Sequence, residues 1–344
     1  MRRVPFSPER VDESQWTNLG GVRTMFVPPM TKRLLPIILL VAVASGTATP
    51  VRAASGYAGE FLAVGAGARG LALGGAFVAL VDDASAGYWN PAALASPHPR
   101  EAHFMHAERY SGLVDQDFVA IVGGGGLMFD GLAVSLLRLG VDGIEFTSVP
   151  DAAAPVGPDN RPVVSSSESA ADYALYLSGG RHLGERLDVG ASAKVIYRAV
   201  ADFTAYGVGV DLAARYRLAQ GVTVAANLRD ATTTPVFWDT DTTDRIQPSL
   251  SLGIAFVRQL AGGQASFAVS SRAGGNAEDD SGATPVNAGF EYQAGRVAIR
   301  SGFEEERQTY GVGLRLGQRM TVDVAYLQHD ALEGTYLLSA TVGF

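Results

Sequence analysis

Apolar and polar residues alternate along most of the chain beyond residue 100. The last ten residues alternate most clearly, and one face of this segment holds Tyr336, Leu338, Ala340, Val342 and Phe344. The other face holds small or polar residues, with Leu337 as the one exception. A period of two residues indicates β-strands. The same period recurs in residues 203–217, 247–258, 308–316 and 319–328.

The alternation predicts about 14 strands, followed by connections that are alternately long and short. The predicted strands cover residues 101–110, 115–123, 128–140, 170–181, 186–198, 203–217, 221–229, 247–258, 264–272, 285–293, 296–303, 308–316, 319–328 and 335–344. The two longest connections are 141–169 and 230–246. Bacterial membrane barrels have an even number of strands, with short turns at one end and longer loops at the other.

A soluble β-sandwich would also alternate, so the composition of the two faces matters. The polar faces hold mostly Gly, Ser and Thr, and the apolar faces lack charge and are often bounded by Tyr or Phe. A barrel in lipid needs an outward apolar band flanked by aromatic residues. We therefore interpret residues 101–344 as an all-β domain, a transmembrane antiparallel β-barrel in the outer membrane of a Gram-negative bacterium.

The beginning of the chain has the pattern of an export signal. Lys32 and Arg33 precede the apolar run 34–43, and small residues follow up to Ala53. This order is typical of a secretory signal peptide, which we place at residues 30–53. A membrane anchor is the alternative, but the apolar run is well short of the roughly 20 residues that a spanning helix needs.

Residues 1–29 fit no signal pattern. We therefore expect that the start was assigned too early and that Met30 begins the protein.

Composition limits the functions that are open to the chain. It has no cysteine, which excludes disulfides and thiolate metal sites. The formal net charge of −8 argues against nucleic-acid binding, because such proteins carry a basic patch.

Residues 54–100 differ from the rest, because Gly and small apolar residues dominate them. Such residues allow compact, irregular packing in a confined space. The stretch FLAVGAGARGLALGGAFVALVDDASAGYWNPAAL covers residues 61–94, and its DDAS and WNPAAL parts are the most specific. This stretch resembles the PorV/PorQ family of outer-membrane proteins and, more distantly, the FadL-type hydrophobic-compound channels. The order of signal peptide, this segment and a barrel that ends in Phe matches as well.

The resemblance implies that residues 54–100 form a plug, or hatch, inside the barrel, and that movement of this plug releases ligand. The residues that we expect to anchor or gate the plug are Phe61, Asp82, Asp83, Trp89, Asn90 and Pro91. Pro91 suits a rigid corner, because proline fixes φ and has no N–H.

Charged residues on faces that we interpret as inward form a second candidate set. They are Asp188, Lys194, Asp211, Arg215, Glu291, Arg300, Arg315 and Asp323. Facing the lumen spares them the cost of roughly 2–4 kcal/mol that a basic residue has at the bilayer midplane. Two interpretations stay open. The charges contact the plug or a passing solute, or they form ion pairs that only brace the barrel.

Other motifs predict no chemistry. Gly65, Gly67 and Gly70 match a dinucleotide fingerprint, but no βαβ unit follows them. The four glycines at 123–126 lack the Lys of a phosphate loop. The histidines have no serine or cysteine partner that stands out by context, so we expect no catalytic residue, no cofactor and no enzyme activity.

Three aspartates, Asp239, Asp241 and Asp244, lie in one predicted loop and offer calcium ligands. They lack the Gly and Glu of an EF-hand, so a solvated loop is favoured and we expect no metal.

The function that these patterns favour is an outer-membrane barrel that binds or passes hydrophobic small molecules and is gated by its plug. The alternative is a PorV-like accessory barrel that docks secreted proteins for export or surface attachment. Outer-membrane lipid and the barrel-assembly machinery, which reads a terminal aromatic residue such as Phe344, are the other expected partners.

Overall fold

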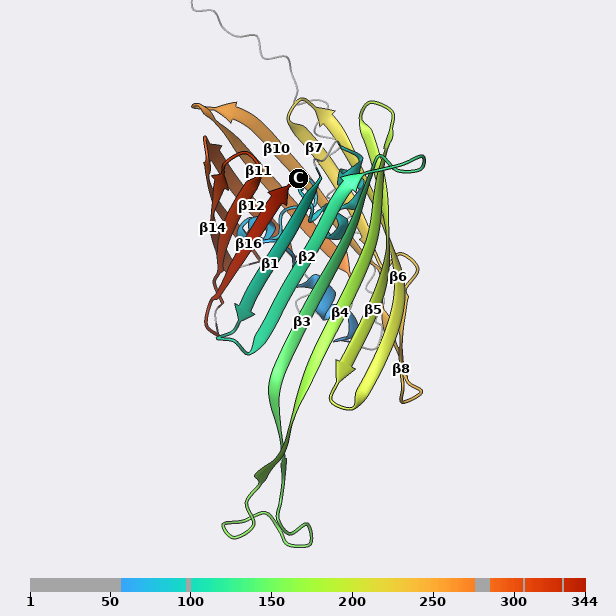
Figure 1. Ribbon diagram of the computed structural model, residues 1–344, viewed down its shortest axis with the longest axis vertical. Helices are drawn as coiled ribbons and strands as arrows, with labels where there is room; N and C mark the ends of the chain where they lie inside the picture. Colours follow the sequence, from blue (N-terminus) through green and yellow to red (C-terminus); the bar gives the residue numbers. More distant parts are fainter. Residues whose placement is uncertain (1–56, 97–99, 276–284, 306, 330) are drawn as a thin grey trace, which may run out of the picture. The chain divides into compact units, whose positions relative to one another are not determined.

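The computed structural model describes residues 57–96, 100–275, 285–305, 307–329 and 331–344, and our expectations for residues 1–56 lie outside these ranges. The described strands belong to a single antiparallel sheet that curves into a barrel (Figure 1). The strands are β1 (Glu101–Arg109), β2 (Val114–Gly124), β3 (Gly131–Ser148), β4 (Val163–Leu183), β5 (Leu187–Val200), β6 (Phe203–Ala219), β7 (Val222–Arg229), β8 (Thr234–Trp238), β9 (Thr243–Ile246), β10 (Ser249–Leu260), β11 (Gly263–Gly274), β12 (Val286–Ala294), β13 (Val297–Glu304), β14 (Arg307–Leu316), β15 (Met320–Leu327) and β16 (Thr335–Gly343).

Two pairings close the sheet into a ring. β1 pairs with β16, from Glu101 opposite Gly343 to Glu108 opposite Tyr336. β5 pairs with β6 along its whole length. Among the described residues sixteen strands form the sheet, and the hairpin of β8 and β9 branches from β6, so fourteen strands form the ring itself. The predicted fourteen-stranded barrel is confirmed.

Side chains alternate between the lumen and the outer surface, as the sequence pattern predicts. In β16, Leu338 is 52% exposed, whereas its neighbours Leu337 and Ser339 are 1% and 0% exposed. Exposed apolar residues occupy outward positions around the ring, among them Phe104, Val134, Val208, Phe290, Val312 and Val324. The outer surface is therefore apolar over most of its area, as contact with lipid requires.

One polar cluster interrupts this outer surface. The carboxylate of Asp117 on β2 lies 2.7 Å from Nδ1 of His106 on β1 and 2.9 Å from Nη1 of Arg138 on β3. Each of these charges has a partner, which lowers the cost of placing it outside the lumen.

Residues 57–96, which we call the lumen segment, lie inside the ring. Its helices are η2 (Tyr57–Ala63), α2 (Ala68–Ala72), α3 (Ala86–Trp89) and η3 (Pro91–Ala95). No helix in the described ranges is long and apolar enough to cross a membrane. Leu73, Phe77 and Ala86 are completely buried, which shows how tightly the segment fills the lumen.

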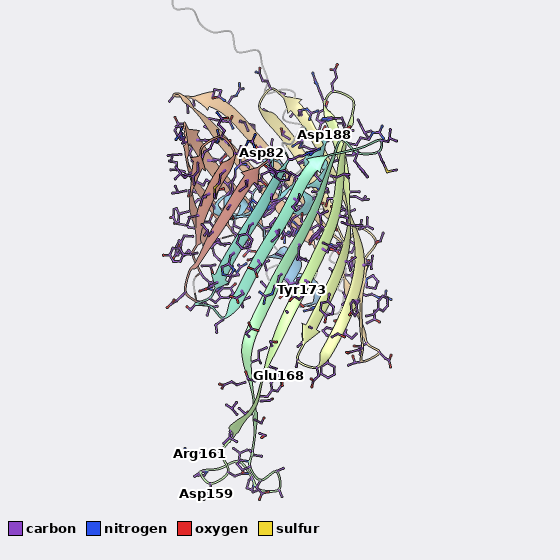
Figure 2. The ribbon with its side chains drawn as sticks, in the orientation of Figure 1. Asp82, Asp159, Arg161, Glu168, Tyr173 and Asp188 are labelled. Atoms are coloured by element: carbon purple, nitrogen blue, oxygen red, sulfur yellow. The ribbon has the colours of Figure 1, made fainter. Side chains whose placement is uncertain are left out.

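The two ends of the ring differ. Short turns join β4 to β5, β6 to β7 and β10 to β11 at one end, which we call the short-turn end (Figure 1). At the opposite, long-loop end, β3 and β4 continue far past the rim as a two-stranded hairpin whose tip includes Asp159 and Arg161 (Figure 2).

This long hairpin corrects our assignment of residues 141–169 as a loop. β3 continues to Ser148, and β4 begins at Val163. The projecting parts, such as 163–167, are exposed on both faces, so no alternation marks them as strands.

The β8–β9 hairpin likewise corrects our assignment of residues 230–246 as a loop. β8 pairs with β6 at Ala205 opposite Trp238, and Pro235 faces Arg245 of β9. Proline and the Asp residues nearby are depleted in strands, so local preference hides these strands.

Two wall glycines let the lumen segment approach the ring closely. A Cβ atom on Gly180 would lie 2.5 Å from the backbone nitrogen of Ala95, and one on Gly190 would lie 2.3 Å from backbone atoms of Pro91 and Ala92. Neither distance allows a side chain. The backbone of η3 therefore rests directly on β4 and β5.

We expect Gly190→Ala to lower the free energy of unfolding by about 1–3 kcal/mol, the usual cost of overpacking. Denaturant titration of the purified barrel, together with proteolysis of the lumen segment, measures the effect. Gly124→Ala is the matched control, because a Cβ atom there meets nothing within 4 Å. Wild-type stability and protection in Gly190→Ala would contradict the close approach.

Candidate functional site

The lumen segment is organised around Tyr88 and Trp89. The hydroxyl of Tyr88 donates to the carbonyl of Leu62 (2.8 Å) and accepts from the N–H of Gly65 (2.9 Å). The indole N–H of Trp89 donates to the carbonyl of Ala66 (2.7 Å). These bonds join α3 to the first part of the segment, so the segment is held together by side-chain contacts as well as by its short helices.

Aromatic rings connect this centre to the wall. Tyr88 meets Trp89 edge to face, with ring centroids 5.2 Å apart. Its ring also contacts Phe118 of β2 and Tyr176 of β4, each at 6.0 Å. Such pairs add about 0.5–1.5 kcal/mol each beyond their buried area.

Asn90, which we predicted as an anchor, is completely buried. Its Nδ2 donates to the carbonyl of Val78 (3.0 Å), and its Oδ1 accepts from the N–H of Ala92 (3.0 Å). It thereby caps η3, whose first residue is Pro91. Proline fits this position because its fixed φ is helical and its missing N–H would be unpaired there.

Phe61 is buried in η2, beneath the guanidinium of Arg198, which lies 5.5 Å from the ring centroid. Arg198 itself pairs with Asp172 of β4 at 2.6 Å. The wall thus holds Phe61 through a cation–π contact.

Arg69 of α2 joins the lumen segment to the wall by charge. Its Nε and Nη2 each lie 2.9 Å from a carboxylate oxygen of Glu291, a bidentate pair. Arg300 continues this chain, with 2.6 Å to Glu291 and 2.8 Å to Asp323. Three of the predicted inward charges therefore form one network with the segment, in the geometry that gives arginine–carboxylate pairs their strength.

Asp82 and Asp83 lie on the other side of Arg69. Its Nη1 contacts Asp82 and lies 3.7 Å from Asp83. Burial raises the pKa of Asp83, but His103, Arg69 and hydrogen bonds from Ser85 outweigh burial and hold the pKa below its usual value. Arg69 is therefore shared between the segment's own carboxylates and the wall.

Asp188 is the centre of a second charged group, also toward the short-turn end (Figure 2). Its carboxylate lies 3.0 Å from Arg215, 2.6 Å from Arg217 and 2.5 Å from Nδ1 of His182. Arg215 also donates to the hydroxyl of Ser96. This group therefore holds the C-terminal end of the lumen segment.

Lys194 forms a third group within the wall. Its Nζ lies 2.9 Å from Asp211 and 2.8 Å from Asp230, and Asp230 accepts from the hydroxyl of Thr234. The group lies where β7 ends and the β8 hairpin begins. These contacts join wall residues to one another, as the bracing interpretation expects.

Arg315 is the exception among the predicted charges, because it is exposed and has no ion pair among the described residues. It lines a polar cavity of about 210 Å³ at the short-turn end, together with Arg69, Glu101, Arg296 and Asp323.

Sequence reasoning missed several wall residues that hold the segment, among them two on β7. Arg229 of β7 donates to the carbonyls of Leu62 and Tyr88, each at 3.2 Å, and Asn227 donates to the carbonyl of Trp89 at 2.9 Å. Both lie on the inward face of β7, so the alternation that identified Asp188 would have found them. No alternation of apolar and polar residues could have identified Arg69, because the lumen segment has no regular sequence period.

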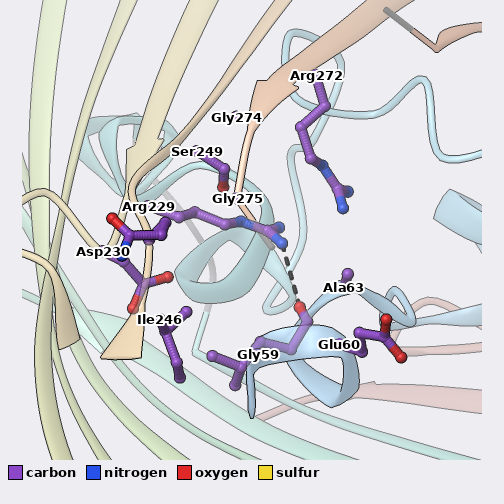
Figure 3. A pocket seen from close by; sticks show the side chains of 12 residues that line it. Gly59, Glu60, Ala63, Arg229, Asp230, Ile246, Ser249, Arg272, Gly274 and Gly275 are labelled. Atoms are coloured by element: carbon purple, nitrogen blue, oxygen red, sulfur yellow. Dashed lines mark hydrogen bonds between the residues drawn. The ribbon is translucent and has the colours of Figure 1, made fainter. Parts of the chain in front are cut away.

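A smaller cavity of about 70 Å³ lies beside η2, between β7 and β11 (Figure 3). It is about half the size of a cavity of roughly 150 Å³ that holds one benzene molecule. This cavity therefore cannot hold even one such molecule.

The acidic loop does not gather its carboxylates into a metal site. Asp239 accepts from the N–H of Thr204 (2.9 Å), and Asp244 accepts from the indole of Trp238 (2.8 Å). No group of three or more His, Cys, Asp or Glu able to hold a metal ion occurs in the described part of the chain.

Solved structures share this fold. The toluene transporter TodX of P. putida is 13% identical, with a TM-score of 0.53 over 81% of this chain and 99% of that one. The CymD monoaromatic hydrocarbon channel is 14% identical, with a TM-score of 0.54 over 82% and 98%. The Ralstonia pickettii toluene transporter TbuX is 12% identical, with a TM-score of 0.50 over 81% and 98%.

At this identity the likeness shows the fold alone, a barrel shared with these three structures. None of these three structures is a PorV or PorQ protein, so they do not support the resemblance to that family. No protein-family model matches the sequence, and no curated protein matches it.

A double-mutant cycle tests the link between Arg69 and Glu291. We expect Arg69→Gln and Glu291→Gln to show a coupling free energy of about 0.5–3 kcal/mol, because the two residues contact each other directly. Denaturant titration of the four proteins gives this value. Arg258→Gln, an exposed arginine on β10, should change stability by no more than about 0.5 kcal/mol. Additive effects of the two substitutions would contradict the link.

Proposed function

We propose that the chain is an outer-membrane barrel that passes hydrophobic small molecules and that the lumen segment is its gate. One observation supports this most directly: a closed ring with an apolar outer surface contains a segment that blocks it. Outer-membrane lipid covers the outer surface. The neighbours named for toluene and monoaromatic hydrocarbons support this class of cargo.

The way in which the segment is held favours a gate over a permanent seal. Its polar contacts with the wall are side-chain hydrogen bonds and ion pairs, such as those of Asn227, Arg229 and Arg69. A hydrogen bond of this type contributes about 0.5–1.5 kcal/mol, or about 1.5–3 kcal/mol when one group is charged. Each of these bonds can therefore break singly, at a modest cost in free energy.

Asn90→Ala tests the gate. The substitution removes the bonds to Val78 and Ala92, and neither bond involves a wall strand. Loosening the segment by about 1–2 kcal/mol would raise the open population about 5- to 30-fold. We expect faster toluene uptake by cells that express the variant, and an unchanged heat-resistant barrel on gel electrophoresis.

Gln259→Ala is the control for Asn90→Ala, because it removes an exposed amide at a short turn. A folded Asn90→Ala barrel with wild-type uptake would rule out gating by this segment. If cells with the wild-type protein take up toluene no faster than cells without the protein, hydrocarbons such as toluene are ruled out as the cargo.

The rival proposal is an accessory barrel that docks secreted proteins, and the projecting β3–β4 hairpin favours it. Exposed apolar residues such as Phe146, Val156 and Val163 lie on this hairpin. A two-stranded hairpin is marginal in water by itself, so a partner that covers it would stabilise it.

Deletion of residues 150–165 separates the two proposals. If the chain docks secreted proteins, the deletion abolishes their surface attachment and leaves toluene uptake unchanged. If the chain is a channel alone, the surface proteins of deletion and wild-type cells are the same. Mass spectrometry of proteins released from the cell surface, beside the uptake assay, measures both.

A further inference from the structure

We infer that the turn between β2 and β3, residues 125–130, is a membrane anchor whose apolar tip inserts into the periplasmic leaflet of the outer membrane. Short turns of bacterial barrels face the periplasm, so this turn lies beside that leaflet. The inference goes beyond the proposed function, because it depends on neither the cargo nor the lumen segment.

The β2–β3 turn differs from the other described turns at the short-turn end. Those turns have two or three residues between their strands and carry Gly, Ala or polar residues, at 184–186, 220–221, 261–262, 295–296 and 317–319. The β2–β3 turn is longer and includes Leu127, Met128 and Phe129. Leu127 is 104% exposed and Met128 is 68% exposed. Neighbouring large apolar residues that are exposed in this way mark a surface that another phase or molecule covers.

The exposed tip is held in a fixed position by backbone bonds. The N–H of Gly125 donates to the carbonyl of Asp130 (2.9 Å), which closes the turn. The N–H of Asp130 donates to the carbonyl of Gly180 on β4 (2.9 Å), and its carboxylate accepts from the N–H of His182 (2.7 Å). The fold therefore presents Leu127 and Met128 at a defined place on the rim.

Phe129 shows that the turn leans toward the lipid side of the wall. On β4, Ser178 and Gly180 face the lumen segment, which they contact. Gly179 lies between them and faces outward, because successive residues of a strand alternate. A Cβ atom on Gly179 would lie 2.7 Å from the ring of Phe129, so this ring rests on the outer face of β4. In Figure 1 the turn that follows β2 reaches sideways from the ring.

The tip continues the apolar surface that lipid covers. Leu132 of β3 pairs with Gly179, and Leu177 lies on the same outer face of β4. The two leucines are 44% and 54% exposed. Phe129 and the tip extend this apolar face past the end of the wall. Apolar side chains at such a boundary insert between the lipid head groups and the acyl chains. The phospholipid leaflet is therefore the occupant that this surface fits.

Two arginines lie at the level of the lipid head groups. Arg181 is exposed on the outer face of β4, and its Nη1 lies 3.4 Å from the carbonyl of Met128. Arg186 is exposed in the next turn, and neither arginine has an ion pair in the described part of the chain. Arginine at a membrane surface rests its stem on apolar groups and points its guanidinium at phosphate. Asp130 and Glu185 are also exposed here, so the apolar tip supplies the attraction and the arginines set its depth.

Fluorescence from one label tests the anchor, since the chain has no cysteine and an introduced thiol reacts alone. Leu127→Cys carries bimane in the full chain, folded into phosphatidylcholine vesicles. Iodide in the water and a nitroxide-labelled phosphatidylcholine in the bilayer are the two quenchers. Burial of a side chain as large as leucine favours the inserted state about tenfold, so iodide should quench this label about tenfold less than one at Asp159→Cys on the hairpin tip. The lipid nitroxide should quench it strongly.

Gln318→Cys is the matched control, because it carries the same label on a polar turn at the same end. Iodide should quench this label as well as it quenches the label at Asp159→Cys. A second comparison places the label at Met128→Cys, with and without Leu127→Asp. The aspartate should raise iodide quenching and lower lipid quenching of the label. Heat-resistant mobility on gels establishes that each barrel is folded.

Three results would overturn the anchor. Iodide quenching that is equal at Leu127→Cys and Asp159→Cys places the tip in water. Lipid quenching that is equal at Leu127→Cys and Gln318→Cys shows that the whole rim is immersed and that the apolar turn is not an anchor. Protection of the Leu127→Cys label from both quenchers shows that a protein, such as a second copy of the chain, covers the tip.

Discussion

Closure of the sheet is the constraint on which the rest of the structure depends. β1 and β16 are the first and last strands in the chain, and their pairing removes the edges that an open sheet would leave. In lipid no water is present to bond an unpaired backbone group, so the pairing must be complete within the protein. Once the ring is closed, every strand has an inner and an outer face, and the period of two in the sequence follows.

The position of the charged residues, inside the ring, follows from the same constraint. Outward positions meet lipid, where an isolated charge is costly, so ionisable groups gather in the lumen and pair there. Glu291 and Asp188 each hold two arginines, and each network also reaches the lumen segment, through Arg69 or Ser96. The polar lining thus both braces the wall and holds the segment, which unites the two interpretations that the sequence left open.

The parts of the fold that sequence predicts are those where one face is buried and the other meets lipid. The strands of the ring and the inward charges follow from alternation alone, because burial differs from one residue to the next. The projecting part of the β3–β4 hairpin has no such contrast, and Pro235 and the nearby aspartates hide β8 and β9, so the sequence predicts loops in both places. Arg69 was not predicted for a different reason. The lumen segment is held by contacts between residues far apart in the sequence, such as Arg69 and Glu291, which are 222 positions apart.

The proposed gate requires a lumen segment that is held firmly enough to close the barrel and loosely enough to move. Strand pairing with the wall would fix it cooperatively, since many backbone bonds would have to break together. Separate side-chain bonds have another property, because each one can be replaced by a ligand or by water without unfolding a strand. Arg229 contacts both η2 and α3 and also lines a cavity beside them. A single wall residue therefore holds two separate parts of the segment.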